Sequence, residues 1–302
     1  MPLQSPFLNQ LKRFARSHVP PAVRHPLAAG FASVRQRLGG DEHALQELAR
    51  RHHALNRGFG PERIAIREHL VLDIAPDSRD PFEHFCFRSI EMKQEMDFFI
   101  DRMRDKRCLL DIGSLHGIFA LVFCHGRPAR AIAVEPSPLA FPKLMDNIRR
   151  NAAHRIDAFN LAASDRPGRI PMQLDWEHLV AIPPAGRPDD PAVREVEARP
   201  MDDLIREHRY PVDLIKIDVE GHEGPVLHGL LGTLEARQPD LFLELHPQLV
   251  EQRGETVAGI VGLLTNRGYR LTDLAGRAVP PDRLYRQADV FRIFATGASA
   301  AG

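Results

Sequence analysis

The sequence is poor in cysteine, and it has neither a long apolar run nor an excess of one charge. Its three thiols, Cys86, Cys108 and Cys124, are isolated, and no C-x-x-C pair occurs. This spacing argues against a disulfide framework and against a cysteine zinc site, and it favours a reducing compartment such as the cytoplasm. No apolar run approaches the roughly 18 residues of a membrane span, and the first residues lack the apolar stretch of a secretory signal.

Charge is balanced over the whole chain, with 40 Lys and Arg against 40 Asp and Glu. This balance does not point to nucleic acid as a partner. Residues 1–40 nevertheless contain six Lys or Arg and no acidic residue. We expect a solvated basic arm there, with peripheral contact to an anionic membrane surface and a targeting peptide as the alternatives.

The first hundred residues read as helical pieces. Apolar periodicity predicts helices over 41–53 and 89–102, and residues 63–73 alternate like a strand. We therefore expect a mainly helical extension and cap over 1–104, an α/β domain over 105–296 and a disordered tail over 297–302.

From Arg107 onward, short apolar runs alternate with helical patterns. The runs predict seven strands, over 108–112, 131–135, 158–163, 212–219, 241–246, 269–274 and 290–295. Such alternation is typical of a doubly wound α/β fold, in which a mostly parallel sheet has helices on both faces. The last two strands have no full helix between them, so we expect a terminal antiparallel strand inserted into the sheet.

Residues 166–200 interrupt this rhythm with seven prolines. Segments 169–174 and 193–198 could form a hairpin around a loose loop. Two interpretations remain open: a lid or substrate-recognition element beside the ligand site, and a tolerated surface insertion.

The run LLDIGSLHGIFA indicates a strand ending at Asp111, followed by a turn that Gly113 and Gly117 flank. Open parallel sheets bind ligands at such strand ends. Leu115 stands where a dinucleotide fold needs its second glycine, which disfavours NAD and FAD. The turn suits a smaller cofactor whose carboxylate and sulfonium lie over the loop; the alternative is a purely structural turn.

Acidic residues follow the next two predicted strands. Glu135, which precedes Pro136, can accept hydrogen bonds from both hydroxyls of a ribose. Asp165, after Ser164, could accept from the exocyclic amine of an adenine. The alternatives are a solvent-facing glutamate and a turn aspartate.

The run VDLIKIDVEGHE places Lys216, Asp218 and Glu220 on one side of an apolar strand. A lone buried charge is costly, so Lys216 and Asp218 either pair with each other or point into a site. Glu223 would then begin the next helix, with His222 displayed at the rim of the site.

The run LFLELHP gives Glu244 and His246 the same parity at another strand end. With Asp218 they form a possible acid/His cluster, which could supply a general base or bind a divalent metal. The alternative is that His246 caps the strand while Glu244 pairs with Lys216.

The set DIGSLHG, EPSP, AASD, MDDL and VDLIKIDVEGHE resembles the FkbM family of methyltransferases over 107–246, with a weaker continuation to 295. The resemblance implies a class I methyltransferase fold and transfer of a methyl group from S-adenosyl-L-methionine to a hydroxyl of a sugar, lipid or secondary metabolite. The expected catalytic residues are Lys216, Asp218, His222 and His246. The expected cofactor site comprises Asp111, Gly113, Ser114, His116, Gly117, Glu135, Pro136, Ser164, Asp165 and Asp218.

Three other functions fit the same sequence. One is a nucleotide-dependent oxidoreductase on the same sheet, against which Leu115 argues. Another is a non-catalytic cofactor-binding module of the same fold, and the third is a membrane-peripheral scaffold that uses the basic arm. No residue identifies the methyl acceptor.

Overall fold

The structure is a computed structural model that describes residues 42–87, 89–175, 178–181 and 193–297. The predicted basic arm and residues 298–302 of the predicted tail lie outside this range. The chain divides into two compact units, residues 1–51 and 52–302. Helix α3 (Glu42–Leu55) confirms the helix predicted over 41–53 and crosses from one unit into the other.

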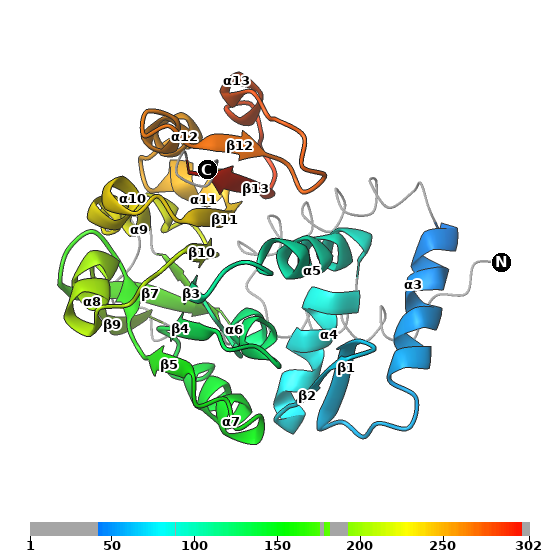
Figure 1. Cartoon of the computed structure of the whole chain (residues 1–302). Helices are drawn as coiled ribbons and strands as arrows, with labels where there is room; N and C mark the ends of the chain where they lie inside the picture. Colours follow the sequence, from blue (N-terminus) through cyan, green and yellow to red (C-terminus); the bar gives the residue numbers. More distant parts are fainter. Residues whose placement is uncertain (1–41, 88, 176–177, 182–192, 298–302) are drawn as a thin grey trace. The chain divides into compact units, whose positions relative to one another are not determined.

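The described residues of the second unit contain a seven-stranded sheet in the order β12-β13-β11-β10-β3-β4-β5 (Figure 1). Strand β13 pairs antiparallel with both β11 and β12, and the pairs among β11, β10, β3, β4 and β5 are parallel. This arrangement confirms the predicted class I methyltransferase sheet and its inserted antiparallel strand. The strands are β3 (Cys108–Ile112), β4 (Arg130–Val134), β5 (Ile156–Phe159), β10 (Leu214–Ile217), β11 (Asp240–Leu245), β12 (Arg270–Thr272) and β13 (Phe291–Thr296).

Helices cover both faces of this sheet (Figure 1). One face packs its apolar side chains against α8 (Met201–His208), α9 (Glu223–His228), α10 (Leu231–Ala236) and α12 (Val257–Thr265). On the opposite face, Phe99 of α5 (Ile90–Arg102) lies 4.9 Å from Phe119 of α6 (Ile118–Cys124) and 6.1 Å from Phe242, between ring centroids. Because side chains alternate along a strand, the polar residues of β3, β10, β11 and β13 face α5 and α6. The remaining helices are α4 (Arg79–Phe87), α7 (Phe141–Arg150), α11 (Pro247–Gln252), α13 (Pro281–Leu284) and the 3-10 turn η2 (Pro76–Ser78).

The insertion forms most of a separate four-stranded sheet in the order β6-β9-β7-β8. Strands β7 (Gly168–Asp175) and β9 (Val193–Arg199) pair antiparallel, which confirms the predicted hairpin. Strand β8 (His178–Ala181) was not predicted. Strand β6 (Ala162–Ala163) was predicted as the end of the third strand of the main sheet, but it pairs with β9 instead.

The described region before the sheet contains both predicted helices, α3 and α5, and also α4 and η2, which were not predicted. Residues 63–73, predicted to alternate like a strand, form a hairpin of β1 (Arg63–Arg67) and β2 (Leu70–Asp73). Helix α5 begins where predicted, because the Ser89 hydroxyl accepts a hydrogen bond from the Met92 N–H at 3.0 Å. Helix α5 lies within the predicted extension 1–104, and it packs on the sheet as part of the unit 52–302.

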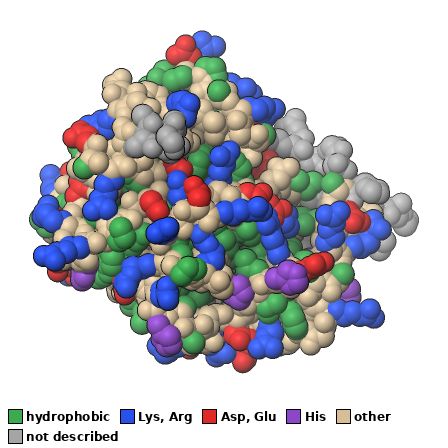
Figure 2. All heavy atoms as spheres, viewed as in Figure 1, with side chains coloured by type: hydrophobic (Ala, Val, Ile, Leu, Met, Phe, Trp, Pro, Cys, Tyr) green, Lys and Arg blue, Asp and Glu red, His purple; other side chains and the backbone are tan. Residues whose placement is uncertain are grey.

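The described surface mixes both charges, and Figure 2 shows Lys and Arg side chains interspersed with Asp and Glu. None of the described helices is long and apolar enough to cross a bilayer.

Asn147 of α7 links the segment after β2 to the loop that precedes α6. Its Oδ1 accepts from the Ala75 N–H at 2.7 Å, and its Nδ2 donates to the Ser78 hydroxyl and the His116 carbonyl, both at 2.9 Å. The side chain is fully buried, so water cannot replace these bonds without rearrangement.

We expect Asn147→Ala to lower the free energy of unfolding by about 2 to 4 kcal/mol, because it leaves buried polar groups unsatisfied. Arg149→Ala, on the exposed side of the same helix, is the control and should change it by less than about 1 kcal/mol. Urea unfolding followed by circular dichroism measures both. Equal losses in the two variants would contradict the role given to Asn147.

Candidate functional site

The turn after β3 joins the carboxyl ends of three neighbouring strands. The N–H groups of Gly113 and Ser114 both donate to the Val134 carbonyl at the end of β4, at 2.9 and 3.1 Å. Gly113 has φ +79°, and a Cβ there would lie 1.8 Å from the Asp218 carbonyl oxygen beyond β10. Only glycine allows this approach, so the predicted importance of Gly113 has a steric cause.

Glu135 is buried and holds the same turn. Its Oε2 accepts from the Leu115 N–H and its Oε1 from the Ser137 N–H, each at 2.7 Å. Burial raises the pKa of Glu135 to about 7, although both hydrogen bonds oppose the shift. Each carboxylate oxygen can accept a further hydrogen bond, so the group could still bind a donor.

Leu115 has φ +48°, a left-handed conformation that favours Gly or Asn. Its backbone N–H nevertheless makes the contact to Glu135, so this bond does not depend on the side chain.

Asp111 lies fully buried at the end of β3. Among the described residues, neither of its carboxylate oxygens has a hydrogen-bond partner. Burial raises its pKa to about 6, and Lys216, its register partner on β10, opposes the shift. Such a carboxylate is poised to receive a cationic or hydrogen-bonding group.

Lys216 pairs with Asp218, which is one of the two arrangements that the sequence predicts for these buried charges. Its Nζ lies 3.2 Å from Asp218 Oδ2 and 4.5 Å from the centre of the Phe119 ring. Burial alone would lower the pKa of Lys216, but Asp218 and Asp111 raise it. Burial would likewise raise the pKa of Asp218, but Lys216 and His246 lower it, so the pair is charged.

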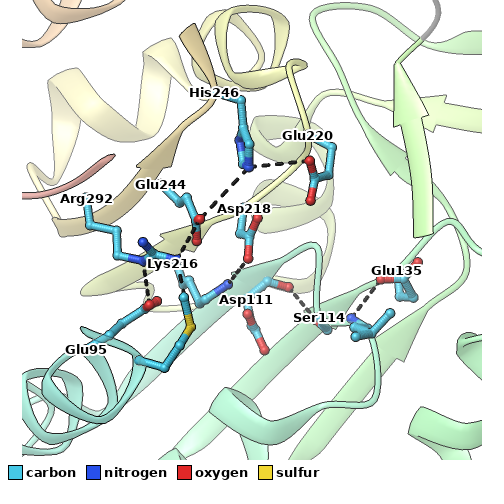
Figure 3. A network of polar contacts seen from close by, with 12 residues as sticks. Glu95, Asp111, Ser114, Glu135, Lys216, Asp218, Glu220, Glu244, His246 and Arg292 are labelled. Carbon is cyan, nitrogen blue, oxygen red and sulfur yellow. Dashed lines mark hydrogen bonds and ion pairs between the residues drawn. The ribbon is translucent and has the colours of Figure 1, made fainter. Parts of the chain in front are cut away.

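Glu244 does not pair with Lys216, as the alternative prediction had it, but with Arg292 (Figure 3). Arg292 Nη2 donates to Glu244 Oε1 at 2.7 Å, and Arg292 Nε lies 2.5 Å from Glu95 Oε2 on α5. The prediction was wrong because Arg292 comes from β13, whose residue 292 is in register with Glu244. Burial first and then Asp218 raise the pKa of Glu244 to about 8.

His246 was predicted, as one alternative, to cap its strand. In the structure its imidazole lies among three carboxylates. Its Nδ1 lies 2.7 Å from Glu223 Oε1, and its Nε2 lies 3.4 Å from Glu220 Oε2 and 3.9 Å from Glu244 Oε1. Burial lowers the pKa of His246, but the Glu223 hydrogen bond and the Glu220 charge raise it to about 10.

The three residues of the predicted acid/His cluster do lie close together. One donor atom from each of Asp218, Glu244 and His246 lies within 4.8 Å of the others, a spacing that could hold a metal ion.

His222 is not displayed at the rim, so that prediction was wrong. It is buried at the start of α9, with Nε2 3.1 Å from the Ser164 hydroxyl, which in turn donates to Asp165 at 3.1 Å. Burial, followed by Arg253, lowers the pKa of His222 to about 4. Because α9 packs back toward the segment after β5, His222 belongs with Ser164 and Asp165.

The other predicted cofactor residues lie around the turn. His116 is buried and Pro136 half-buried, and Gly117 begins α6 with φ +85°. A Cβ on Gly117 would lie 2.4 Å from the Leu144 side chain.

Four members of the polar network were not among the predicted site residues: Glu95, Glu220, Glu223 and Arg292. Three of them carry a signal in the sequence, and Glu220 is the one that shares the parity of Lys216 and Asp218. Glu95 interrupts the apolar stripe of α5, and Arg292 shares the parity of Phe294 on a buried strand. Nothing local to Glu223 indicates that it would meet His246, 23 residues later.

Two cavities of about 460 Å³ each lie elsewhere. The first is lined by residues 124–128 and 151–155, which precede β4 and β5 at the amino-terminal edge of the sheet, and His125 lines both. Neither contains a predicted site residue, and ligands of open α/β sheets bind at the opposite edge.

The residues of the turn, β4, β10 and β11 lie in a region that is similar to known methyltransferases. A family model described as the methyltransferase FkbM domain matches residues 111–271, which is more than half of the chain. A search of curated proteins gave no match.

Several solved structures are similar at low identity. A methyltransferase FkbM from Methylobacillus flagellatus KT is 20% identical with a TM-score of 0.43; the match covers 63% of this chain but only 44% of that one. An O-methyltransferase from Bacillus cereus in complex with SAH is 14% identical with a TM-score of 0.39, covering 89% and 97% of the two chains. A precorrin-6y C5,15-methyltransferase from Geobacter metallireducens GS-15 is 14% identical with a TM-score of 0.40, covering 70% and 90%.

We expect Gly113→Ala to lower the free energy of unfolding by at least about 3 kcal/mol, because the new methyl group meets the Asp218 carbonyl and the backbone is left-handed. Gly126→Ala is the matched control, since Gly126 has φ +64° with no atom near a built Cβ. It should cost about 1 to 2 kcal/mol, the conformational penalty alone. Thermal and urea unfolding compare the two, and equal losses would refute the close approach at Gly113.

Proposed function

The chain belongs to the FkbM family of methyltransferases, and on that premise we propose that it methylates a hydroxyl group of a sugar, lipid or secondary metabolite with S-adenosyl-L-methionine as donor. The observation that carries the proposal is the bond between the Gly113–Gly117 turn and Glu135. It places a buried acidic group beside a glycine turn at the carboxyl edge of the sheet, where such folds bind nucleosides.

The residues present fit this cofactor. Glu135 would accept from the ribose hydroxyls with the lone pairs that its two backbone bonds leave over. Asp111, whose buried carboxylate has no hydrogen-bond partner among the described residues, would receive the methionine ammonium. Asp165, exposed after β6, would face the adenine.

When bound, the cofactor supplies a methyl group on a positively charged sulfur. The acceptor oxygen forms a bond to that methyl carbon, the carbon–sulfur bond breaks, and its electron pair stays on sulfur as a neutral thioether. The protein must hold the acceptor oxygen in line with the methyl carbon and the sulfur. It must also supply a base that takes the hydroxyl proton.

The base is best sought at the ends of β10 and β11. Lys216 holds the Asp218 carboxylate at 3.2 Å, so Asp218 is fixed where an acceptor would approach. His246 lies in the same cluster, whereas His222 is bonded to Ser164 on the adenine side. The geometry therefore favours Asp218 over His222 as the group that takes the proton, with His246 positioned beside Asp218.

We expect isothermal calorimetry to detect binding of S-adenosylhomocysteine to the wild-type protein. Glu135→Gln should weaken it by about 10- to 100-fold, the cost of losing hydrogen bonds to a charged acceptor. Glu207→Gln, an exposed carboxylate on α8, is the control. Binding that is absent in the wild type, or unaltered in Glu135→Gln, would defeat the ribose assignment.

We expect Asp218→Ala to lower turnover by about two to four orders of magnitude, since general-base catalysis contributes roughly that much. Turnover is read as a gain of one methylene in the mass of a product, in a cell extract supplied with labelled cofactor. Full activity in Asp218→Ala, with Glu207→Gln again as control, would rule the assignment out.

A further inference from the structure

Four side chains of types that can bind a metal ion lie close together at the ends of two adjacent strands. Asp218 and Glu220 follow β10, and Glu244 and His246 end or follow β11 (Figure 3). His246 Nε2 lies 3.4 Å from Glu220 Oε2 and 3.9 Å from Glu244 Oε1, and Asp218 lies within 4.8 Å. Donors that share an ion at about 2.2 Å are at most about 4.4 Å apart, so closure by a few tenths of an ångström brings them together.

The imidazole of His246 is oriented as a ligand. The side chain is nine-tenths buried, and its Nδ1 lies 2.7 Å from Oε1 of Glu223, which is itself fully buried. Within the described part of the chain Nε2 makes no hydrogen bond, and it points into the cluster (Figure 3). Metal-binding histidines characteristically use their second nitrogen in this way, bonded to a carboxylate that fixes the tautomer.

Two of the three acidic members of the cluster also have an outer partner. Lys216 holds Oδ2 of Asp218, and Arg292 holds Oε1 of Glu244. For the described residues, neither Asp218 Oδ1 nor Glu244 Oε2 has a hydrogen bond or ion pair. Each carboxylate is thus held in place with one oxygen left over for a ligand.

Carboxylates outnumber the cationic side chains around the cluster. In the described chain the cationic groups are Lys216, Arg292 and His246 in its protonated form. The carboxylates that face them are Glu95, Asp111, Asp218, Glu220, Glu223 and Glu244. A divalent ion bound at His246 Nε2 would replace one proton charge by two, which lowers the cost of burying these carboxylates.

We propose that Asp218, Glu220, Glu244 and His246 bind one divalent cation of the Mn²⁺ class. Carboxylates suit Mg²⁺ and Mn²⁺, imidazole suits Zn²⁺ and Fe²⁺, and Mn²⁺ accepts such a mixed donor set. The role of the ion, though not its binding, rests on the proposed methyl transfer. A bound ion would make a coordinated hydroxyl more acidic, as zinc lowers the pKa of its bound water, so that a weak carboxylate base could take the proton.

The test is a titration of the full chain with Mn²⁺, after EDTA treatment and gel filtration, with free Mn²⁺ read by electron paramagnetic resonance. We expect one Mn²⁺ per chain. Asp218→Asn, Glu244→Gln and His246→Gln should each weaken binding at least about 10-fold, and Glu223→Gln about 10- to 100-fold through the orientation of His246. Glu207→Gln should bind as the wild type does.

Absence of stoichiometric binding, or unchanged affinity in the cluster variants, would overturn the proposal. Circular dichroism melts verify folding, and the half-buried Glu220→Gln provides a ligand variant if a buried one does not fold. Calorimetry with S-adenosylhomocysteine separates the two proposals. Cofactor binding and turnover without Mn²⁺ binding would refute the metal site and leave the proposed methyl transfer standing. Mn²⁺ binding at this cluster without cofactor binding would support the metal site and count against methyl transfer.

Discussion

A buried lysine between carboxylates is the interaction on which the site depends. Lys216 is 2% exposed, pairs with Asp218, lies in register with Asp111 and covers the Phe119 ring. Without its charge, the buried carboxylate of Asp111 and the half-buried carboxylate of Asp218 would repel each other with no cation to compensate them. A buried ion pair contributes little net stability, because desolvation offsets the attraction. What Lys216 contributes is a fixed direction for the Asp218 side chain at the carboxyl edge of the sheet.

Backbone contacts at the same edge hold the turn after β3 in place. Parallel strands end together, so β3, β4, β10 and β11 present their following residues to one volume. The turn at Gly113 touches the chain beyond β10, and the N–H of Leu115 reaches Glu135 beyond β4. The segments that contain Asp218 and Glu135 are therefore coupled through one short turn, and a shift of this turn would displace both residues together.

Features governed by local sequence were predictable, and those set by distant pairing were not. Apolar runs and glycine turns indicated all seven strands, and parity alone placed Lys216 and Asp218 on one side. The wrong partner for Glu244 has a topological origin: β13 inserts antiparallel beside β11, and only its register brings Arg292 opposite. His222 was misplaced for a similar reason, since the direction in which α9 packs toward Ser164 is not a local property.

The polar network extends beyond the region that the family model matches. The family match ends at residue 271 and begins at 111, yet Glu95 lies before it and Arg292 after it. These two residues pair with each other, and Arg292 also holds Glu244. The cofactor turn and Glu135 lie inside the match. The charge around Glu244 is thus set partly by α5 and β13, which reach the edge of the sheet from outside the matched region.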